Sequence, residues 1–121
     1  MDAAILAAMG DPRSAPEYTV VMSTVGSEDA AARLAHSAVE RRLAACVQSS
    51  PIASVYRWED EIQEDLEVLL LFKTASDRVA ALREYIQEQH EYEVPEILEL
   101  PVSGGSAGYL GWVHASTRLE G

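Results

Sequence analysis

The stretch PIASVYRWEDEIQEDLEVLLLFKT, residues 51–74, predicts two long β-strands joined by an acidic turn at Asp60–Glu61. The first arm alternates between its two faces, with Tyr56 and Trp58 on the same side. The second arm carries an apolar run, residues 68–72, that is typical of a strand covered on both faces. Because both arms exceed the usual strand length of about five or six residues, the rings near the turn need a packing surface beyond one small domain.

The sequence on either side of this hairpin predicts the element order β-α-β-β-α-β followed by a short helix. The remaining predicted elements are a strand over 18–25, a helix capped by Ser27 that ends near 43, a strand that starts at 44–47 and resumes after Pro51, a helix capped by Ser76 that ends near 89, a strand over 97–102 and a helix over 107–116. This order is the ferredoxin-like split β-α-β pattern of the α+β class, which places two helices on one face of a four-stranded antiparallel sheet. Pro51 and Pro101 predict edge positions or bulges.

The predicted architecture leaves one face of the sheet open. The apolar run at 68–72 needs cover on that face, and no predicted helix remains to provide all of it. Self-association with the open faces turned inward would bury this run. The sequence therefore predicts an oligomer.

Length and composition predict one soluble domain. A chain of 121 residues has room for a single core. We place the domain at 18–118, after a poorly ordered extension over 1–17 that contains glycine and proline and before a tail over 119–121. The net charge of −11, with only nine Lys and Arg residues, argues against a nucleic acid partner. It permits cation binding, although solubility is the simpler reason for an acidic surface.

Cysteine content and the first residues predict a cytoplasmic location. A single cysteine, Cys46, excludes an internal disulfide and is expected to be buried and structural. The apolar run over 3–9 is too short to span a bilayer, and no basic residue precedes it as in a signal peptide. We therefore expect no membrane association and no export.

Five blocks of the sequence, taken in order, resemble the CutA family of divalent-cation tolerance proteins. The blocks are LAACV (43–47), SVYRWED (54–60), EVLLLFKT (67–74), HEYEVPEI (90–97) and YLGW (109–112). The resemblance covers about residues 18–118. It implies a ferredoxin-like fold, a tight homotrimer similar to that of the PII signalling proteins, a cytoplasmic location and a role in tolerance to divalent metals, notably copper.

The same resemblance implies a candidate metal site. Copper binding has been proposed in some members through a cysteine late in the first strand and histidines before the Tyr-Glu-x-Pro segment. In this chain the two positions hold Ser23 and a single histidine, His90, with Glu93 close by in sequence. Ser23 is a poorer ligand than a thiolate. His90, Ser23 and Glu93 are thus the candidate ligands of copper or another divalent ion, and a helix C-cap is the alternative role of His90.

A second set of residues is expected to form the trimer contacts and the cleft between subunits. These residues are Tyr56, Trp58, Glu67, Lys73, Tyr92, Glu96 and Trp112. We expect the aromatic rings to be packing anchors rather than a ligand cage. Lys73 is expected to pair with a carboxylate such as Glu96 across subunits. We expect the six acidic residues between 59 and 67 to be solvated charges at the turn rather than a cation site.

Sequence motifs do not indicate an enzyme. The chain has no nucleophile elbow, Walker loop, dinucleotide fingerprint or HExxH motif. We therefore expect a non-enzymatic homotrimer that responds to divalent metal ions at clefts between subunits, with no partner named beyond itself. The alternative is a PII-like regulatory or scaffold trimer that binds a small molecule or a protein and has no specific metal site.

Overall fold

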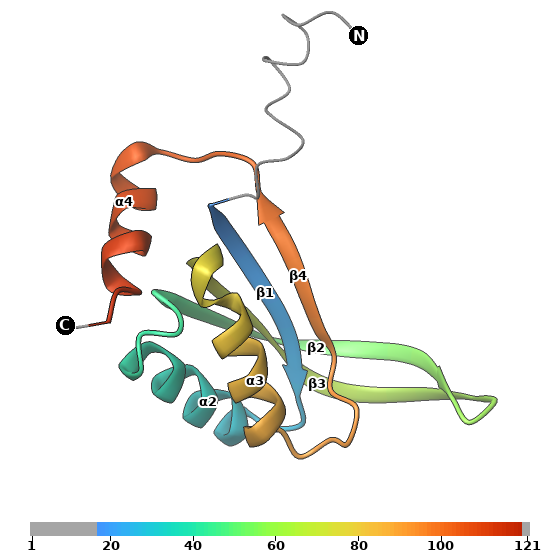
Figure 1. Cartoon of the computed structure of the whole chain (residues 1–121). Helices are drawn as coiled ribbons and strands as arrows, with labels where there is room; N and C mark the ends of the chain where they lie inside the picture. Colours follow the sequence, from blue (N-terminus) through green and yellow to red (C-terminus); the bar gives the residue numbers. More distant parts are fainter. Residues whose placement is uncertain (1–16, 120–121) are drawn as a thin grey trace, which may run out of the picture.

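The computed structural model describes residues 17–119, which form four strands, three α-helices and a short 3₁₀ helix (Figure 1). The elements are β1 (Tyr18–Val25), α2 (Glu28–Glu40), β2 (Cys46–Trp58), β3 (Glu61–Ala75), η1 (Ser76–Arg78), α3 (Val79–Gln89), β4 (Ile97–Val102) and α4 (Ala107–Ser116). The predicted extension over 1–17 and tail over 119–121 fall almost wholly outside the described residues.

The four strands form one antiparallel sheet in the order β2-β3-β1-β4. Helices α2 and α3 cover one face of this sheet, as expected from the element order (Figure 1). Between these helices and the sheet lies a core of aliphatic side chains and one phenylalanine. Its fully buried members are Val21, Ala38, Ala44, Leu70, Phe72, Leu82 and Ile86. Burying these side chains is the main source of stability for a chain of this size.

The other face of the sheet remains without helices over most of its area. On β3 the side chains of Val68, Leu70 and Phe72 point to the helices and are buried, whereas Leu69 and Leu71 point away and are half-buried. The two-sided cover expected for this run is therefore present only on the helix side of a single chain. We call the uncovered side the open face.

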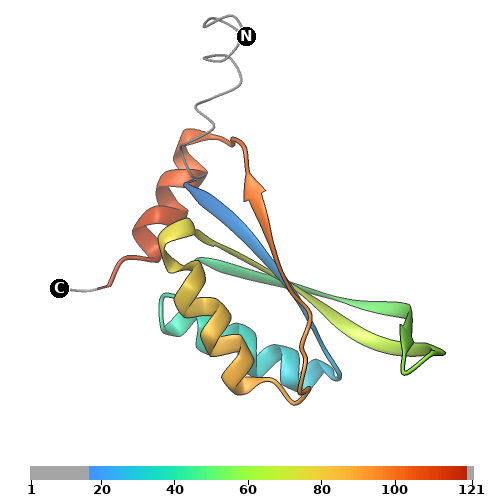
Figure 2. The ribbon, with the colours of Figure 1, turned by 45° about the vertical axis from the view of Figure 1, so that its right-hand side comes forward.

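Strands β2 and β3 pair from Cys46↔Lys73 to Trp58↔Glu61 and project past the helices as a long hairpin (Figure 2). The turn lies at Glu59 and Asp60, one residue earlier than predicted, and both residues have positive φ, 50° and 65°. A two-residue loop with positive φ at both positions matches the twist of a hairpin. The prediction that Pro51 interrupts the strand was wrong, because β2 is an edge strand and runs through it without a break.

The predicted cap of α2 is confirmed, and the predicted cap of the next helix is wrong. The Ser27 hydroxyl accepts a hydrogen bond from the Ala30 amide. Ser76 instead opens η1, and its hydroxyl lies 2.7 Å from the Thr19 hydroxyl of β1. Helix α2 also ends at Glu40, before the expected position near 43, because Arg42 turns the chain with a φ of 58°.

Helix α4 packs at the end of the sheet where β1 begins and β3 ends. Val113 and Thr117 are buried there, and the Arg118 guanidinium donates two hydrogen bonds, 2.6 and 2.5 Å long, to the Asp77 carboxylate. These bonds hold the chain after α4 against η1 and lower the pKa of Asp77. Within residues 17–119 no helix is long and apolar enough to cross a membrane.

Candidate functional site

A wide hollow lies between the hairpin and the connector at 90–96, which joins α3 to β4. We call it the hairpin groove, and its volume is about 950 Å³. It is lined by Gly26, Ala53, Ser54, Val55, Tyr56, Trp58, Asp65, Leu66, Glu67, Tyr92, Glu93, Val94 and Glu96. Four of these residues carry carboxylates and three carry aromatic rings, so the groove combines negative charge with flat apolar surfaces.

Two tyrosines of the groove donate hydrogen bonds to carboxylates of β3. The Tyr56 hydroxyl bonds to Asp65, and this bond, with smaller contributions from desolvation and nearby charges, raises the pKa of Tyr56 to about 12. The Tyr92 hydroxyl lies 3.5 Å from a Glu67 oxygen, and its pKa is raised by burial first and by Glu67 second. Both tyrosines are therefore neutral donors at physiological pH, and they position the carboxylates that accept from them.

His90 ends α3 and ties the connector to the end of β1. Its Nδ1 accepts a 3.0 Å hydrogen bond from the Tyr92 amide, which requires the proton of the neutral ring to be on Nε2. Nε2 in turn donates to the Thr24 carbonyl at 2.6 Å. The ring also lies against Tyr92, with 4.7 Å between ring centroids. His90 is the C-cap residue of α3, but its side chain bonds to β1 and the connector rather than to the last helical carbonyls.

The predicted ligands His90, Ser23 and Glu93 do not gather at one point. Ser23 is fully buried in β1, and its hydroxyl donates to the Glu96 carbonyl at 2.7 Å. Glu93 is exposed and lines the hairpin groove. Because both nitrogens of His90 are already engaged, neither has a free lone pair for a metal in this arrangement. In residues 17–119 no group of three or more His, Cys, Asp or Glu residues could hold a metal ion.

Five of the seven residues predicted for the cleft lie together in the hairpin groove. They are Tyr56, Trp58, Glu67, Tyr92 and Glu96. The other two, Lys73 and Trp112, do not line it. The Lys73 ammonium lies 5.6 Å from the centre of the Tyr109 ring on α4, and Trp112 packs beside the same ring at 5.5 Å. Within one chain, Lys73 therefore contacts an aromatic face, and its predicted pairing with Glu96 of another subunit stays a prediction.

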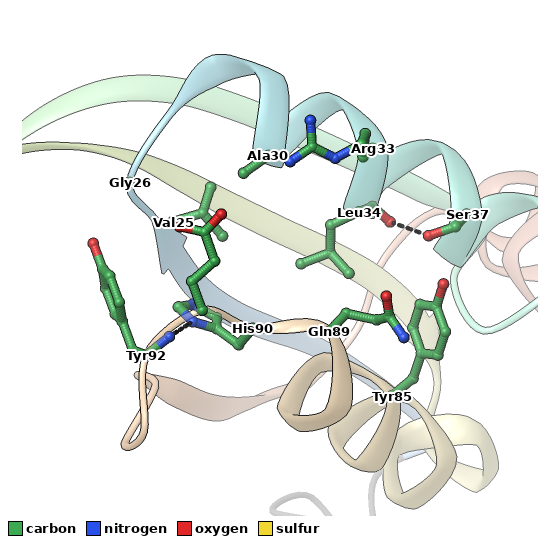
Figure 3. A pocket seen from close by; sticks show the side chains of 11 residues that line it. Val25, Gly26, Ala30, Arg33, Leu34, Ser37, Tyr85, Gln89, His90 and Tyr92 are labelled. Carbon is green, nitrogen blue, oxygen red and sulfur yellow. Dashed lines mark hydrogen bonds between the residues drawn. The ribbon is translucent and has the colours of Figure 1, made fainter.

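Sequence reasoning missed Asp65 and a second, smaller cavity. Asp65 was grouped with the solvated acids of the turn, although its position in β3, diagonal to Tyr56 across the ladder, was a usable signal. The second cavity, of about 240 Å³, lies between α2 and the end of α3 (Figure 3). His90, Tyr92 and Gln89 line it together with Arg33, which no sequence pattern had singled out. Cys46, expected to be buried, is only half-buried.

Comparison with known proteins gives a family match across nearly all of the described residues. The family described as "CutA1 divalent ion tolerance protein" matches residues 19–116. A chloroplastic CutA protein of Arabidopsis thaliana is 47% identical over 100 residues, which is 82% of this chain and 55% of that protein. A divalent-cation tolerance protein CutA of Thermus thermophilus is 46% identical over 99 residues, 81% of this chain and 96% of that protein.

Solved structures agree with the sequence matches. The divalent cation tolerance protein of Thermus thermophilus superposes with a TM-score of 0.81 and 44% identity, covering 84% of this chain and 99% of that one. The CutA structure of Synechococcus elongatus superposes with a TM-score of 0.83 and 38% identity, covering 85% of this chain and 92% of that one. Coverage of the plant relative is lower, since the matched region spans about half of its length.

Proposed function

The chain belongs to the CutA1 divalent ion tolerance family, and we propose that it acts without catalysis, as a homotrimer whose hairpin grooves bind divalent cations. Its sheet order and the two helices on one face support the ferredoxin-like description expected from the sequence. Tolerance to divalent ions is the role that the name of the family gives. The trimer, the cation site and the absence of catalysis are our inferences.

The distribution of exposed apolar side chains supports the trimer. Leu98 and Leu100 on the open side of β4 are 53% and 41% exposed in the single chain. Further out, Val55, Ile62 and Leu66 of the hairpin are 67%, 60% and 83% exposed. Both edge strands, β2 and β4, also have unpaired backbone groups along one side. Packing of the hairpin and the open face against neighbouring copies would bury both apolar surfaces and satisfy the strand edges.

The observation that supports the cation site is the set of four carboxylates in the hairpin groove. Asp65, Glu67, Glu93 and Glu96 all line it, and two of them accept hydrogen bonds from tyrosines. Oxygen ligands favour hard cations such as Mn²⁺, Mg²⁺ or Ca²⁺ over copper. Because these carboxylates do not converge as a complete ligand set in one chain, we propose that the neighbouring copy completes the set in the trimer. The residues at His90 and Ser23 do not fit a copper centre, and no metal chemistry is assigned to them.

Calorimetric titration of the purified, undissociated protein with Mn²⁺ tests this proposal. We expect saturable binding with one ion per chain, weakened at least about tenfold by Glu67→Gln or Glu93→Gln. Glu88→Gln, an exposed acid of α3 outside the groove, is the matched control and should bind as the wild type does. Binding that never saturates, or that all three variants weaken equally, would show general attraction to an acidic surface instead.

A PII-like regulatory role is the second candidate, favoured by the size and lining of the same groove. Its volume of about 950 Å³ is within the range of about 300–1,000 Å³ of small-molecule sites. Tyr56, Trp58 and Tyr92 offer ring faces that a simple cation site does not need. A metabolite that raises the melting temperature where Mn²⁺ does not would favour this candidate over the first.

We propose a cytoplasmic location with no membrane or nucleic acid partner. The unpaired, half-buried Cys46 and the net charge of −11 support this proposal. Names of relatives point to other compartments for those proteins, one being called chloroplastic and another, from Archaeoglobus fulgidus, periplasmic. Cell fractionation with an antibody against the chain distinguishes these locations.

A further inference from the structure

The cavity between α2 and the end of α3 is separate in position from most of the hairpin groove. We call it the α2–α3 cavity (Figure 3). Its volume of about 240 Å³ is below the range of about 300–1,000 Å³ that drug-sized ligands occupy, so it suits a smaller molecule such as a single amino acid. Its apolar wall comes from Val25, Ala30 and Leu34. Figure 3 shows this wall facing side chains from α3 and from the turn after it.

Two opposite charges line this cavity without neutralising each other. Arg33 comes from α2 and Glu91 from the connector after His90. Neither side chain takes part in a hydrogen bond or an ion pair with any other residue that the structure describes, and they do not pair with each other. A cation and an anion that both line one small cavity are complementary to a ligand with one group of each sign.

Neutral polar groups surround the other end of the cavity. Tyr85 and Gln89, from successive turns of α3, lie together in Figure 3, opposite the end where Tyr92 lies. Arg41 packs its guanidinium over the Tyr85 ring at 4.9 Å and thereby fixes one face of that ring. Ser37, across from them on α2, donates its proton to the Leu34 carbonyl at 3.2 Å and can still accept one. These groups suit an uncharged polar side chain.

We propose that the α2–α3 cavity binds a free α-amino acid with a short, neutral polar side chain. The α-carboxylate pairs with the guanidinium of Arg33 and the α-ammonium with the carboxylate of Glu91. The ligand side chain extends toward Tyr85 and Gln89. The site uses none of the groove carboxylates, so it stands whether or not the groove binds metal. It also adjoins the groove, because Gly26 and Tyr92 line both.

Titration of the full chain with L-glutamine, followed by amide NMR and calorimetry in a buffer with EDTA, tests the proposal. We expect saturable shifts at the amides of Gly26, Arg33 and Gln89. Arg33→Gln and Glu91→Gln should each weaken binding at least about tenfold. Both side chains are exposed, so the variants should fold normally. Glu88→Gln on α3, which makes the same charge change outside the cavity, should leave binding unchanged.

Two modified probes separate a zwitterion site from a simple ion site. N-acetyl-L-glutamine lacks the ammonium and L-glutamine α-amide lacks the carboxylate, and we expect each to bind at least about tenfold more weakly than L-glutamine. Equal binding of either probe would overturn the zwitterion assignment. The proposal is also overturned if none of the twenty common amino acids binds, or if Glu88→Gln weakens binding as much as Glu91→Gln does.

Discussion

The His90 imidazole links three segments of the backbone through two hydrogen bonds of opposite direction. Nδ1 accepts from the Tyr92 amide of the connector, and Nε2 donates to the Thr24 carbonyl at the end of β1. The sequence offered a metal ligand and a helix cap as roles for this residue, and the contacts point to a third, structural one. Such a role fixes Tyr92, which lines both the hairpin groove and the α2–α3 cavity.

Replacing His90 by alanine should therefore reduce stability. The change leaves the Thr24 carbonyl and the Tyr92 amide without their partners, at a cost of about 1–3 kcal/mol. Urea denaturation measures the loss. The control is His36→Ala on α2, where the side chain is exposed. If the two variants lose equal stability, the His90 hydrogen bonds contribute nothing to the fold.

Asp65 controls the ionisation of Tyr56. Its carboxylate accepts the tyrosine proton, which is the main reason that the pKa of Tyr56 is about 12. In Asp65→Asn the pKa should fall toward the ordinary value of about 10, measured from the ring carbon shift in an NMR titration. A pKa that stays near 12 in the variant would assign the shift to desolvation instead.

The direction of this shift also sets a pH dependence for stability. The folded pKa of Tyr56 is above the unfolded value, so the stabilisation is complete below about pH 10. It is lost as the pH rises from there to about 12. Over that window the wild type should lose more stability than Tyr56→Phe, and a parallel decline of both proteins would contradict the assignment.

At the scale of elements, the hairpin turn is the clearest place where backbone conformation and residue type disagree. Glu59 and Asp60 both have positive φ, a region that Asn and Gly adopt at lower cost. We predict that the double variant Glu59→Asn, Asp60→Gly has a free energy of unfolding, measured by urea denaturation, that is higher by about 0.5–2 kcal/mol. Glu64→Asn, on the exposed strand, provides the comparison. A destabilised turn variant would mean that these acids make contacts beyond the single chain.

Element types and order could be predicted because they follow from local patterns. Apolar periodicity identified the four strands and three α-helices of the described residues but not η1, and Pro51 and Pro101 correctly predicted edge strands. The predictions of the turn position and of the role of Ser76 were wrong for the same reason. Several residues near each boundary have the right chemistry, and long-range pairing chooses among them. The Ser76 hydroxyl, which would have capped the helix, instead forms a hydrogen bond with the hydroxyl of Thr19, a residue distant in sequence.

The candidate site could be predicted only where its residues lie on paired strands or beside them. Tyr56, Trp58 and Glu67 share one face of the hairpin, so their meeting in the groove follows from strand alternation. Lys73 and Trp112 were placed with them, but α4 packs at the opposite end of the sheet. No local signal fixes where a final helix docks. Whether the groove forms part of a cleft between subunits stays a prediction.

For the whole molecule, the open face is the feature that a single chain does not explain. Leu100 on this face and Val39 on α2 are both 41% exposed, but they lie on opposite sides of the sheet. If the open face packs against other copies, Leu100→Asn should destabilise the assembly by about 2 kcal/mol or more, whereas Val39→Asn should stay within about 0.5 kcal/mol of the wild type. Thermal denaturation at several protein concentrations compares them. Equal effects would place the open face in solvent.

The molar mass of the wild type in solution tests the central claim, assembly into a trimer, most directly. Light scattering coupled to size exclusion, run across the micromolar range, should give three times the chain mass of 13.2 kDa. The hairpin and the open face support assembly, because each copy both offers and receives an apolar surface, and the number three is our proposal from the family resemblance. A mass of one chain at all concentrations would contradict the account, since the groove would then have no neighbouring copy to complete its ligand set.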